Sequence, residues 1–237
     1  MARRRPAAAV PPPASVAFEE ATHIYTVDGR PIPSVTQVLN EERFIDFSMV
    51  PNGTLHQAQF RGRYVHAVIH LLLDGDFDLS ECATEYRGYV DSALGYLATL
   101  KKRRLVEVAG GPGVEWRFWH LTRMYAGTID YLGWDVDGVL SIDDWKTGEP
   151  EDVAAALQTA AYEAGVRHCL LPQQLPDYEG PIRRRAVKLF KDGRPGRVEL
   201  YTDPRDLAMF YTALSCVHFR RNHLRHPGEP YGRLPAH

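Results

Sequence analysis

The chain has 237 residues, of which 44% are hydrophobic and 24% are charged, and its formal net charge is −2. These proportions are typical of a globular protein and exclude a collagen, a coiled coil and a chain that is disordered throughout. No run of about 18 consecutive apolar residues occurs, so we expect no membrane-spanning helix.

The total charge does not predict a nucleic-acid partner, but basic residues gather in short clusters. We expect most of these clusters to be solvated faces. They are Arg61 with Arg63, residues 101–104, residues 183–185, and Arg220 and Arg221 with Arg225.

Both ends of the chain differ in composition from the rest. Residues 1–15 are rich in proline, alanine and arginine, and residues 227–237 are rich in proline and glycine. We expect two disordered tails, and the first lacks the uninterrupted apolar run of a signal peptide. The length of residues 16–226 fits a single domain.

The cysteines indicate a reducing compartment. Cys82, Cys169 and Cys216 lie far apart, form no Cys-x-x-Cys pair and are odd in number. We therefore expect no disulfide framework and a cytoplasmic location. An iron–sulfur cluster requires four ligands, so none is expected.

The first predicted elements are a hairpin and a short helix. Residues 23–33 carry β-branched and aromatic residues on both sides of Asp28-Gly29, a dipeptide that favours a hairpin turn. Residues 34–39 begin a short helix, with Ser34 or Thr36 as its N-cap.

Two longer helices follow. Residues 54–73 show the helical apolar spacing, with Val65, Val68, Ile69 and Leu72 on one face, and the glycine of Asp74-Gly75-Asp76 ends the helix. A second helix is predicted over residues 84–100.

Beyond residue 104 the pattern changes to strands. Residues 114–121, 125–132 and 139–145 are rich in β-branched and aromatic residues and predict a meander. Gly148 to Asp152 then opens an alanine-rich helix that is expected to stop at Gly165.

Two strands and a helix complete the chain. Residues 184–190 and 197–201 lie on either side of a glycine-rich turn, and residues 204–223 predict the last helix. This order of elements predicts an α/β sandwich with a mixed sheet.

The most informative residues lie in the third strand of the meander. Alternation along a strand places Asp144 and Lys146 on one face, with Asp143 and Trp145 on the other. Asp130 ends the preceding strand and is expected beside Asp144. Two carboxylates and a lysine at strand ends can hold a divalent cation next to a basic group. An isolated Asp-x-Lys is more often a salt bridge between strands.

The context of this motif favours a site. Gln158 and Tyr162 are spaced i, i+4 on the following helix and share one face. Upstream, the segment Gly62-Arg-Tyr-Val-His66 places an imidazole on a helix, and Glu115 lies on the strand before Asp130.

In chain order these motifs are Gly-x-x-Val-His, Glu, Gly-x-x-Asp, Asp-x-Lys and Gln-x-x-x-Tyr. The series resembles the RecB-type branch of the PD-(D/E)xK nuclease superfamily, especially the small phage and CRISPR-associated exonucleases. The segment from His23 to Gly29, followed by Pro33-Ser-Val-Thr, is similar to the start of the phage members. The resemblance covers about residues 20–222 and implies a restriction-endonuclease-like fold.

The resemblance also implies a site for Mg²⁺ or Mn²⁺. Its ligands would be the side chains of His66, Asp130 and Asp144 and the backbone carbonyl of Trp145. Lys146 resembles the catalytic lysine, and Glu115 matches an acidic position that many members carry. The four cysteines of the cluster-bearing relatives are missing, in agreement with the expected absence of an iron–sulfur centre.

For the substrate, the resemblance implies DNA. Gln158 and Tyr162 match the helix motif that helps to hold DNA and to position the reacting groups. Arg61 and Arg63 are the local arginines expected to contact the DNA backbone. No base-reading element is apparent, so sequence specificity should be low.

The favoured function is a metal-dependent DNA exonuclease in phage-type recombination or end processing. A single-strand annealing or other recombination protein is the expected kind of partner, and a homo-oligomer is compatible with the sequence. The alternatives are a structure-specific or restriction-like endonuclease and a non-catalytic DNA-binding domain with a nuclease-like fold.

Several residues near the motifs have simpler interpretations. His70 lies four residues after His66, but without a third nitrogen or sulfur ligand it is expected to be a helix-face residue and not a zinc ligand. Asp143 is expected to be exposed or salt-bridged. The aromatic residues Trp116, Phe118 and Trp119 are interpreted as core and edge residues, with base stacking as the alternative.

Overall fold

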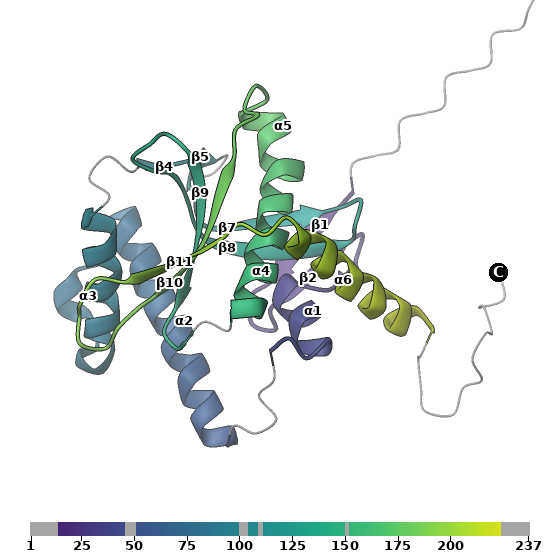
Figure 1. Ribbon diagram of the computed structural model, residues 1–237. Helices are drawn as coiled ribbons and strands as arrows, with labels where there is room; N and C mark the ends of the chain where they lie inside the picture. Colours follow the sequence, from purple (N-terminus) through teal and green to yellow (C-terminus); the bar gives the residue numbers. More distant parts are fainter. Residues whose placement is uncertain (1–13, 46–50, 100–103, 109–110, 150–151, 224–237) are drawn as a thin grey trace, which may run out of the picture.

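The computed structural model describes residues 14–45, 51–99, 104–108, 111–149 and 152–223. It is a mixed α/β sandwich in which helices cover both faces of a mixed sheet, as predicted (Figure 1). Apart from Ala14 and Ser15, the predicted tails lie outside the described residues. Within these ranges, no helix combines the length and the apolar character needed to cross a membrane.

The main sheet contains six strands among the described residues. They are β4 (Arg104–Leu105), β7 (Val114–His120), β8 (Tyr125–Trp134), β9 (Leu140–Lys146), β10 (Ile182–Lys188) and β11 (Arg197–Tyr201). The order is β11-β10-β9-β8-β4, and β7 also pairs with β8. β7, β8 and β9 form the predicted antiparallel meander, and β10 is parallel to β9. The short β4 was not predicted.

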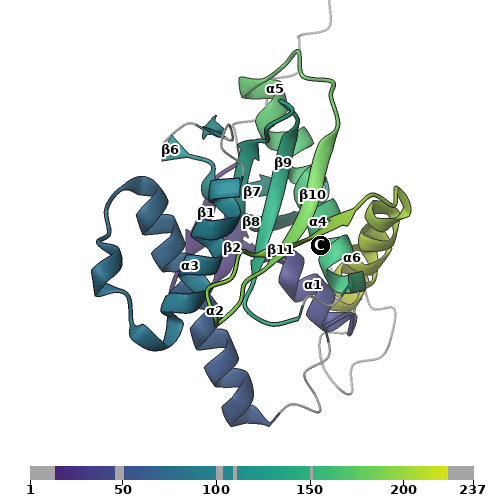
Figure 2. The ribbon, with the colours of Figure 1, turned by 60° about the vertical axis from the view of Figure 1, so that its left-hand side comes forward.

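The helices form a layer on each face of the sheet, as Figures 1 and 2 show. On one face lie α2 (Asn52–Asp74) and α3 (Thr84–Thr99), joined by a short 3₁₀ turn, η1 (Leu79–Glu81). On the other lie α1 (Val35–Glu41), α4 (Asp152–Gly165) and α6 (Arg205–His223). A buried apolar cluster lies under each layer.

The predicted helix limits agree with the structure to within about two residues, because local signals set them. Ser34 caps α1 and forms a capping box with Gln37, whose side-chain oxygen accepts a hydrogen bond from the Ser34 amide. α2 buries Val65, Val68 and Ile69 and ends at Gly75, which adopts a left-handed conformation with φ 82°.

The α-helical part of the fourth helix ends at Gly165 as predicted, but the chain does not leave the helix there. The helix continues through a π-helical segment, η2 (Val166–Leu170), into α5 (Leu171–Gln174). Gly165 has ordinary helical dihedrals. A Cβ at Gly165 would lie 2.5 Å from Cε2 of the buried Phe118, so close packing requires the glycine there.

A small N-terminal sheet packs beside β8. It consists of β1 (Val16–Glu19), β2 (Ile24–Val27) and β3 (Arg30–Ile32), in that order. The predicted hairpin is β2–β3, and Asp28 and Gly29 both have positive φ, as its turn requires. β1 was not predicted, nor was the separate pair β5 (Glu107–Val108) and β6 (Gly111–Pro112).

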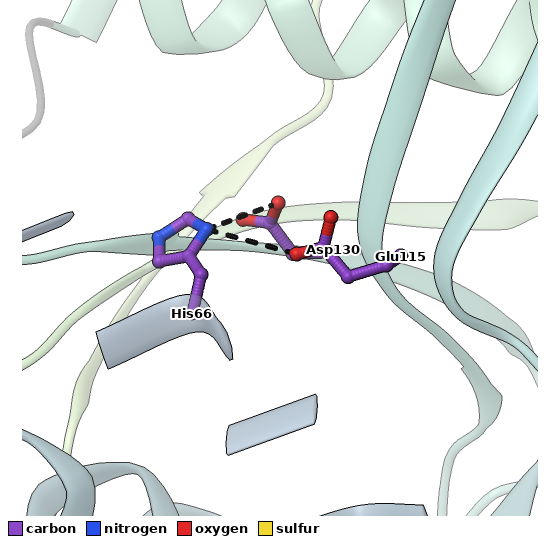
Figure 3. Close-up of side chains that lie close together, drawn as sticks. All are labelled: His66, Glu115 and Asp130. Atoms are coloured by element: carbon purple, nitrogen blue, oxygen red, sulfur yellow. Dashed lines mark ion pairs between the residues drawn. The ribbon is translucent and has the colours of Figure 1, made fainter. Parts of the chain in front are cut away.

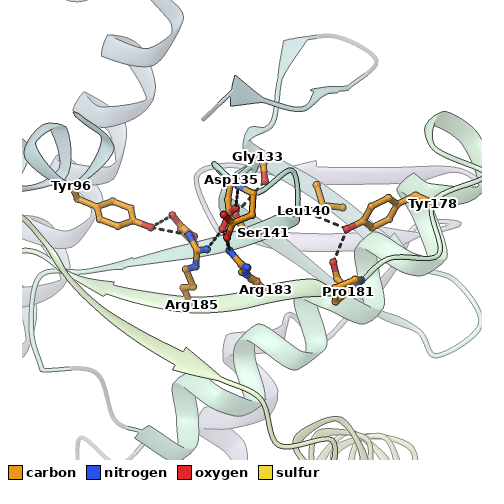
Figure 4. A network of polar contacts seen from close by, with 11 residues as sticks. Tyr96, Gly133, Asp135, Leu140, Ser141, Tyr178, Pro181, Arg183 and Arg185 are labelled. Atoms are coloured by element: carbon orange, nitrogen blue, oxygen red, sulfur yellow. Dashed lines mark hydrogen bonds and ion pairs between the residues drawn. The ribbon is translucent and has the colours of Figure 1, made fainter. Parts of the chain in front are cut away.

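A polar network stabilises the end of the sheet where β9 begins (Figure 4). Arg183 and Arg185 both form ion pairs with the buried Asp135, which lies just after β8. Asp143 is fully buried rather than exposed and accepts a hydrogen bond of 2.9 Å from the Tyr96 hydroxyl. The salt-bridged alternative for Asp143 is supported, because Arg185 Nη1 lies 3.9 Å from its Oδ1.

Residues 183–185 are therefore an exception to the expectation that most basic clusters form solvated faces. Arg184 is also buried and pairs with Asp206 on α6 at 3.0 Å. Their strand, β10, lies inside the sheet with helices on both sides, so the arginines must be paired with acids when they are buried.

The packing of Gly165 against Phe118 gives a test of the fold. Gly165→Ala should lower the free energy of unfolding by about 1–3 kcal/mol, because the added methyl group overpacks a filled core. Gly53→Ala is the matched control, since Gly53 is also helical and a Cβ there meets nothing within 4 Å. Urea denaturation should show the control unchanged or up to about 1 kcal/mol more stable. Equal stabilities of the two variants would contradict this account.

Candidate metal centre

The site begins where β8 and β9 separate. Their antiparallel pairing ends at Tyr131 and Asp143. The Lys146 carbonyl accepts a hydrogen bond from the Leu189 amide on the β10 side. Because successive residues of a strand direct their backbone groups to opposite sides, those of Trp145 face β8. The Trp145 amide donates to Asp130 Oδ2 at 2.7 Å, so a carboxylate replaces the backbone of β8 at this point.

His66 reaches the same gap from α2. Its Nε2 lies 3.0 Å from the Trp145 carbonyl oxygen, and its Nδ1 lies 3.4 Å from Asp130 Oδ1 and 3.9 Å from Glu115 Oε1. Figure 3 shows the imidazole with both carboxylates in front of its Nδ1. Both polar backbone groups of Trp145 are thus bonded by residues of the candidate site.

Glu115 comes from β7, between Val114, which pairs with Tyr131, and Trp116, which pairs with Ile129. Its φ is 49°, in the left-handed region that few non-glycine residues adopt. Such strain persists where the surrounding structure imposes it and is often found at functional sites. Here it accompanies a carboxylate that faces the gap.

His66, Glu115 and Asp130 form a group that can hold a metal ion. Each offers one ligand atom, and these atoms all lie within 4.8 Å of one another. No other group of three such ligands occurs among the residues that the structure describes. One imidazole nitrogen and two carboxylate oxygens suit a divalent cation such as Mn²⁺ or Mg²⁺.

Asp144 and Lys146 form an ion pair beside this group. Lys146 Nζ lies 2.6 Å from Asp144 Oδ2 and donates to Gln158 Oε1 at 2.9 Å. Gln158 in turn donates to the Tyr162 hydroxyl at 2.8 Å. The predicted placement of Asp144 and Lys146 on one strand face is confirmed, and the i, i+4 pair on α4 lies next to them.

The structure distributes the acidic residues differently from the ligand set that the resemblance implies. The group of three contains Glu115, and Asp144 is paired with Lys146 instead. Glu115 lies on β7, the strand next to that of Asp130, and Asp144 shares its strand face with the lysine. Sequence spacing could not decide whether Glu115 or Asp144 lies with His66 and Asp130, because Glu115 approaches the gap through an unusual backbone conformation.

Charge crowding shifts the titration of these groups. Burial alone would lower the pKa of His66, but nearby carboxylates, above all Asp130, raise it to about 9. Burial disfavours the charged form of Asp130, but the charge and hydrogen bond of His66, the Lys146 charge and the Trp145 amide together hold the pKa of that carboxyl below its ordinary value. Burial raises the pKa of Glu115 to about 7 and that of Asp144 to about 6.

All these groups open into a cavity of about 730 Å³. Arg61 and Arg63 of α2 line it, and Arg61 Nε donates to Thr147 Oγ1 at 3.2 Å. Thr147 was not singled out from the sequence, because a hydroxyl next to a motif is too common to be informative. The cavity combines acidic groups that can bind a cation with arginines that can bind phosphate.

Three simpler interpretations from the sequence are confirmed. His70 lies on the face of α2, where it pairs with Asp74 at 2.9 Å and lines the cavity. Phe118 is buried, and Trp116 stacks on it with ring centroids 5.9 Å apart. Trp119 packs on the N-terminal sheet.

No protein-family model and no curated protein sequence matches the chain. Its function is therefore inferred from the geometry and chemistry of this site.

The site predicts a metal affinity that depends on pH. His66 and Glu115 must lose their protons to bind a cation, so the affinity for Mn²⁺ should rise from about pH 6 to about pH 9. Titration calorimetry in buffers of different ionisation enthalpy should show proton release on binding. Mn²⁺ affinity that is independent of pH would contradict this assignment.

Substitution of one carboxylate at a time tests whether Glu115, and not merely any acid of the cavity, binds the metal ion. Glu115→Gln should weaken Mn²⁺ binding at least about tenfold and make its pH dependence near neutrality less steep, because only the His66 proton is then displaced. Glu20→Gln is the control, because Glu20 lines the same cavity outside the group of three. Equal affinities of these two variants would exclude Glu115 as a ligand.

Proposed function

We propose that the protein is a metal-dependent deoxyribonuclease of the PD-(D/E)xK type, in its RecB-like branch, and that it acts as an exonuclease of low sequence specificity. One observation carries the proposal. The group of His66, Glu115 and Asp130 and the Asp144–Lys146 pair lie on the two sides of the same gap between β8 and β9, in one open cavity.

Different residues would bind the metal ion and stabilise the transition state of hydrolysis. His66, Glu115 and Asp130 would hold Mg²⁺ or Mn²⁺. The ligand role that the resemblance implies for the Trp145 carbonyl, which His66 Nε2 contacts, stays a prediction. When bound, the cation polarises the scissile phosphate and makes a bound water more acidic. The ligand role that the resemblance implies for Asp144 stays a prediction.

Lys146 would stabilise the negative charge that develops on the scissile phosphate. Asp144 and Gln158 hold its ammonium at 2.6 and 2.9 Å, so the side chain is oriented before the substrate arrives. A pre-oriented cation beside a phosphate stabilises the charge that builds up in the transition state. Gln158 and Tyr162 are themselves buried, and we assign them to positioning Lys146 rather than to direct contact with DNA.

The arrangement of the strands also supports a restriction-endonuclease-like fold. The antiparallel meander β7-β8-β9, followed by α4 and a parallel β10, places Asp130, Asp144 and Lys146 at strand positions that match the order of the family motifs. Arg61, Arg63 and Arg117 would contact the DNA backbone. A cytoplasmic location and a recombination partner agree with this function.

Removal of the lysine tests the mechanism. Lys146→Ala should lower the rate of DNA hydrolysis in Mn²⁺ at least about 100-fold, while Mn²⁺ binding persists. Lys188→Ala is the control, because Lys188 lies beside Lys146 on β10, pairs with Glu149 and does not line the cavity. Cleavage by the Lys146 variant at the wild-type rate would exclude this assignment.

The topology of the substrate separates the exonuclease from the endonuclease. An exonuclease should degrade an end-labelled linear duplex or single strand and leave a covalently closed circle of the same sequence intact. Gel electrophoresis after incubation with each metal measures both. Cleavage of the closed circle at a comparable rate would replace the proposed activity with that of an endonuclease.

A further inference from the structure

The N-terminal sheet forms one wall of the cavity that contains the metal-binding group. Phe18 and His23, from β1 and the turn after it, line the cavity together with His66, Glu115 and Asp130. This wall has no role in the hydrolysis described above. Besides the carboxylate of Glu20, this segment presents aromatic rings to the cavity, and Arg117 of β7 lies beside them. Aromatic rings next to a guanidinium are typical of surfaces that bind unpaired nucleotides.

The aromatic rings of this wall are arranged edge to face. The His23 ring meets Phe18 at a centroid distance of 5.0 Å and an interplanar angle of 88°. Tyr25 supports Phe18 from the buried side, with ring centroids 4.6 Å apart. His23 is exposed and Phe18 is partly exposed, so both offer ring surface to the cavity.

Arg117 adds a positive charge to the rings. Its guanidinium carbon lies 4.4 Å from the centre of the Phe18 ring, a cation–π contact. Arg117 is exposed and lies on β7 two residues after Glu115. The same strand therefore carries one residue of the metal-binding group and one residue of the wall.

The wall is held rigidly against the metal centre. The Tyr25 hydroxyl lies 2.6 Å from Thr128 Oγ1, and Thr128 precedes Asp130 by two residues on β8. The Ala126 amide also donates to the Pro33 carbonyl. His23 has a φ of 54°, a conformation that is rare for a non-glycine residue and directs its ring from a tight turn.

We propose that Phe18, His23 and Arg117 form a subsite for an unpaired nucleotide of a single-stranded DNA segment, with the base against the rings and the phosphate on the guanidinium. This inference rests on the proposed function and specifies its substrate: the strand enters the site unpaired. The occupant follows from charge complementarity, because the arginines of the cavity attract phosphates and the rings accept any base.

The experiment measures binding without hydrolysis. Fluorescence anisotropy in EDTA compares an intact single-stranded oligonucleotide with a set in which one base at a time is replaced by an abasic residue. The variants are His23→Ala, Arg117→Ala and Phe18→Leu, the last of which keeps an apolar side chain in the wall. Arg194→Ala is the control, because its guanidinium lies 3.8 Å from the Phe190 ring centre outside the cavity.

We expect the wild type to lose about tenfold in affinity when the base at one position is removed. His23→Ala and Phe18→Leu should bind the intact oligonucleotide about tenfold more weakly and lose nothing further at that abasic position. Arg117→Ala should weaken binding to both oligonucleotides, and the control should bind both as the wild type does.

Wild-type affinity in the Phe18 and His23 variants would overturn the subsite, and so would equal losses on intact and abasic DNA. Binding of double-stranded but not single-stranded DNA would overturn it as well. A wild type that shows the abasic effect but hydrolyses no DNA with any metal would refute the nuclease and leave the nucleotide subsite in place.

Discussion

The hydrogen bond from the Trp145 amide to the Asp130 carboxylate is the interaction on which the candidate site depends. A strand inside a sheet must satisfy its backbone groups, and neighbouring strands normally do so. At Trp145 a carboxylate and an imidazole take over that role from β8. The two strands can therefore separate without leaving polar backbone groups unpaired, and the gap between them admits side chains from both layers of helices.

The gap concentrates charge in a way that folding alone would not favour. Three carboxyl groups, an imidazole and an ammonium lie together, and burial pushes the pKa values of two of the acids upward. Partly buried acids that repel one another weaken a fold unless a cation or a basic group offsets them. Clusters of this kind are characteristic of functional sites, and the strained backbone of Glu115 points the same way.

Local patterns in the sequence were sufficient for most helices and strands and for the relation between Asp144 and Lys146. Alternation along a strand is a property of neighbouring residues, and so is the Asp28-Gly29 turn. Glu115 was singled out from the sequence, but its grouping with His66 and Asp130 was not. That grouping, the burial of Asp143 and the pairing of residues 183–185 each depend on an element distant in sequence. The π-helical continuation after Gly165 was not predicted, and the small size of this residue is required by the packing of Phe118. The nuclease activity stays a prediction.

The geometry of the reacting groups is also determined by a strand that does not line the cavity. β10 pairs with β9 along its full length, so Ala186 lies directly beside Asp144. Ala186 is fully buried, and the alanine-rich α4 packs on the same strand. A larger side chain there would act as a spacer between helix and sheet and would carry the Gln158 amide away from the ammonium that it orients. The small side chain of Ala186 thus lets α4 pack close enough to the sheet for Gln158 to orient Lys146.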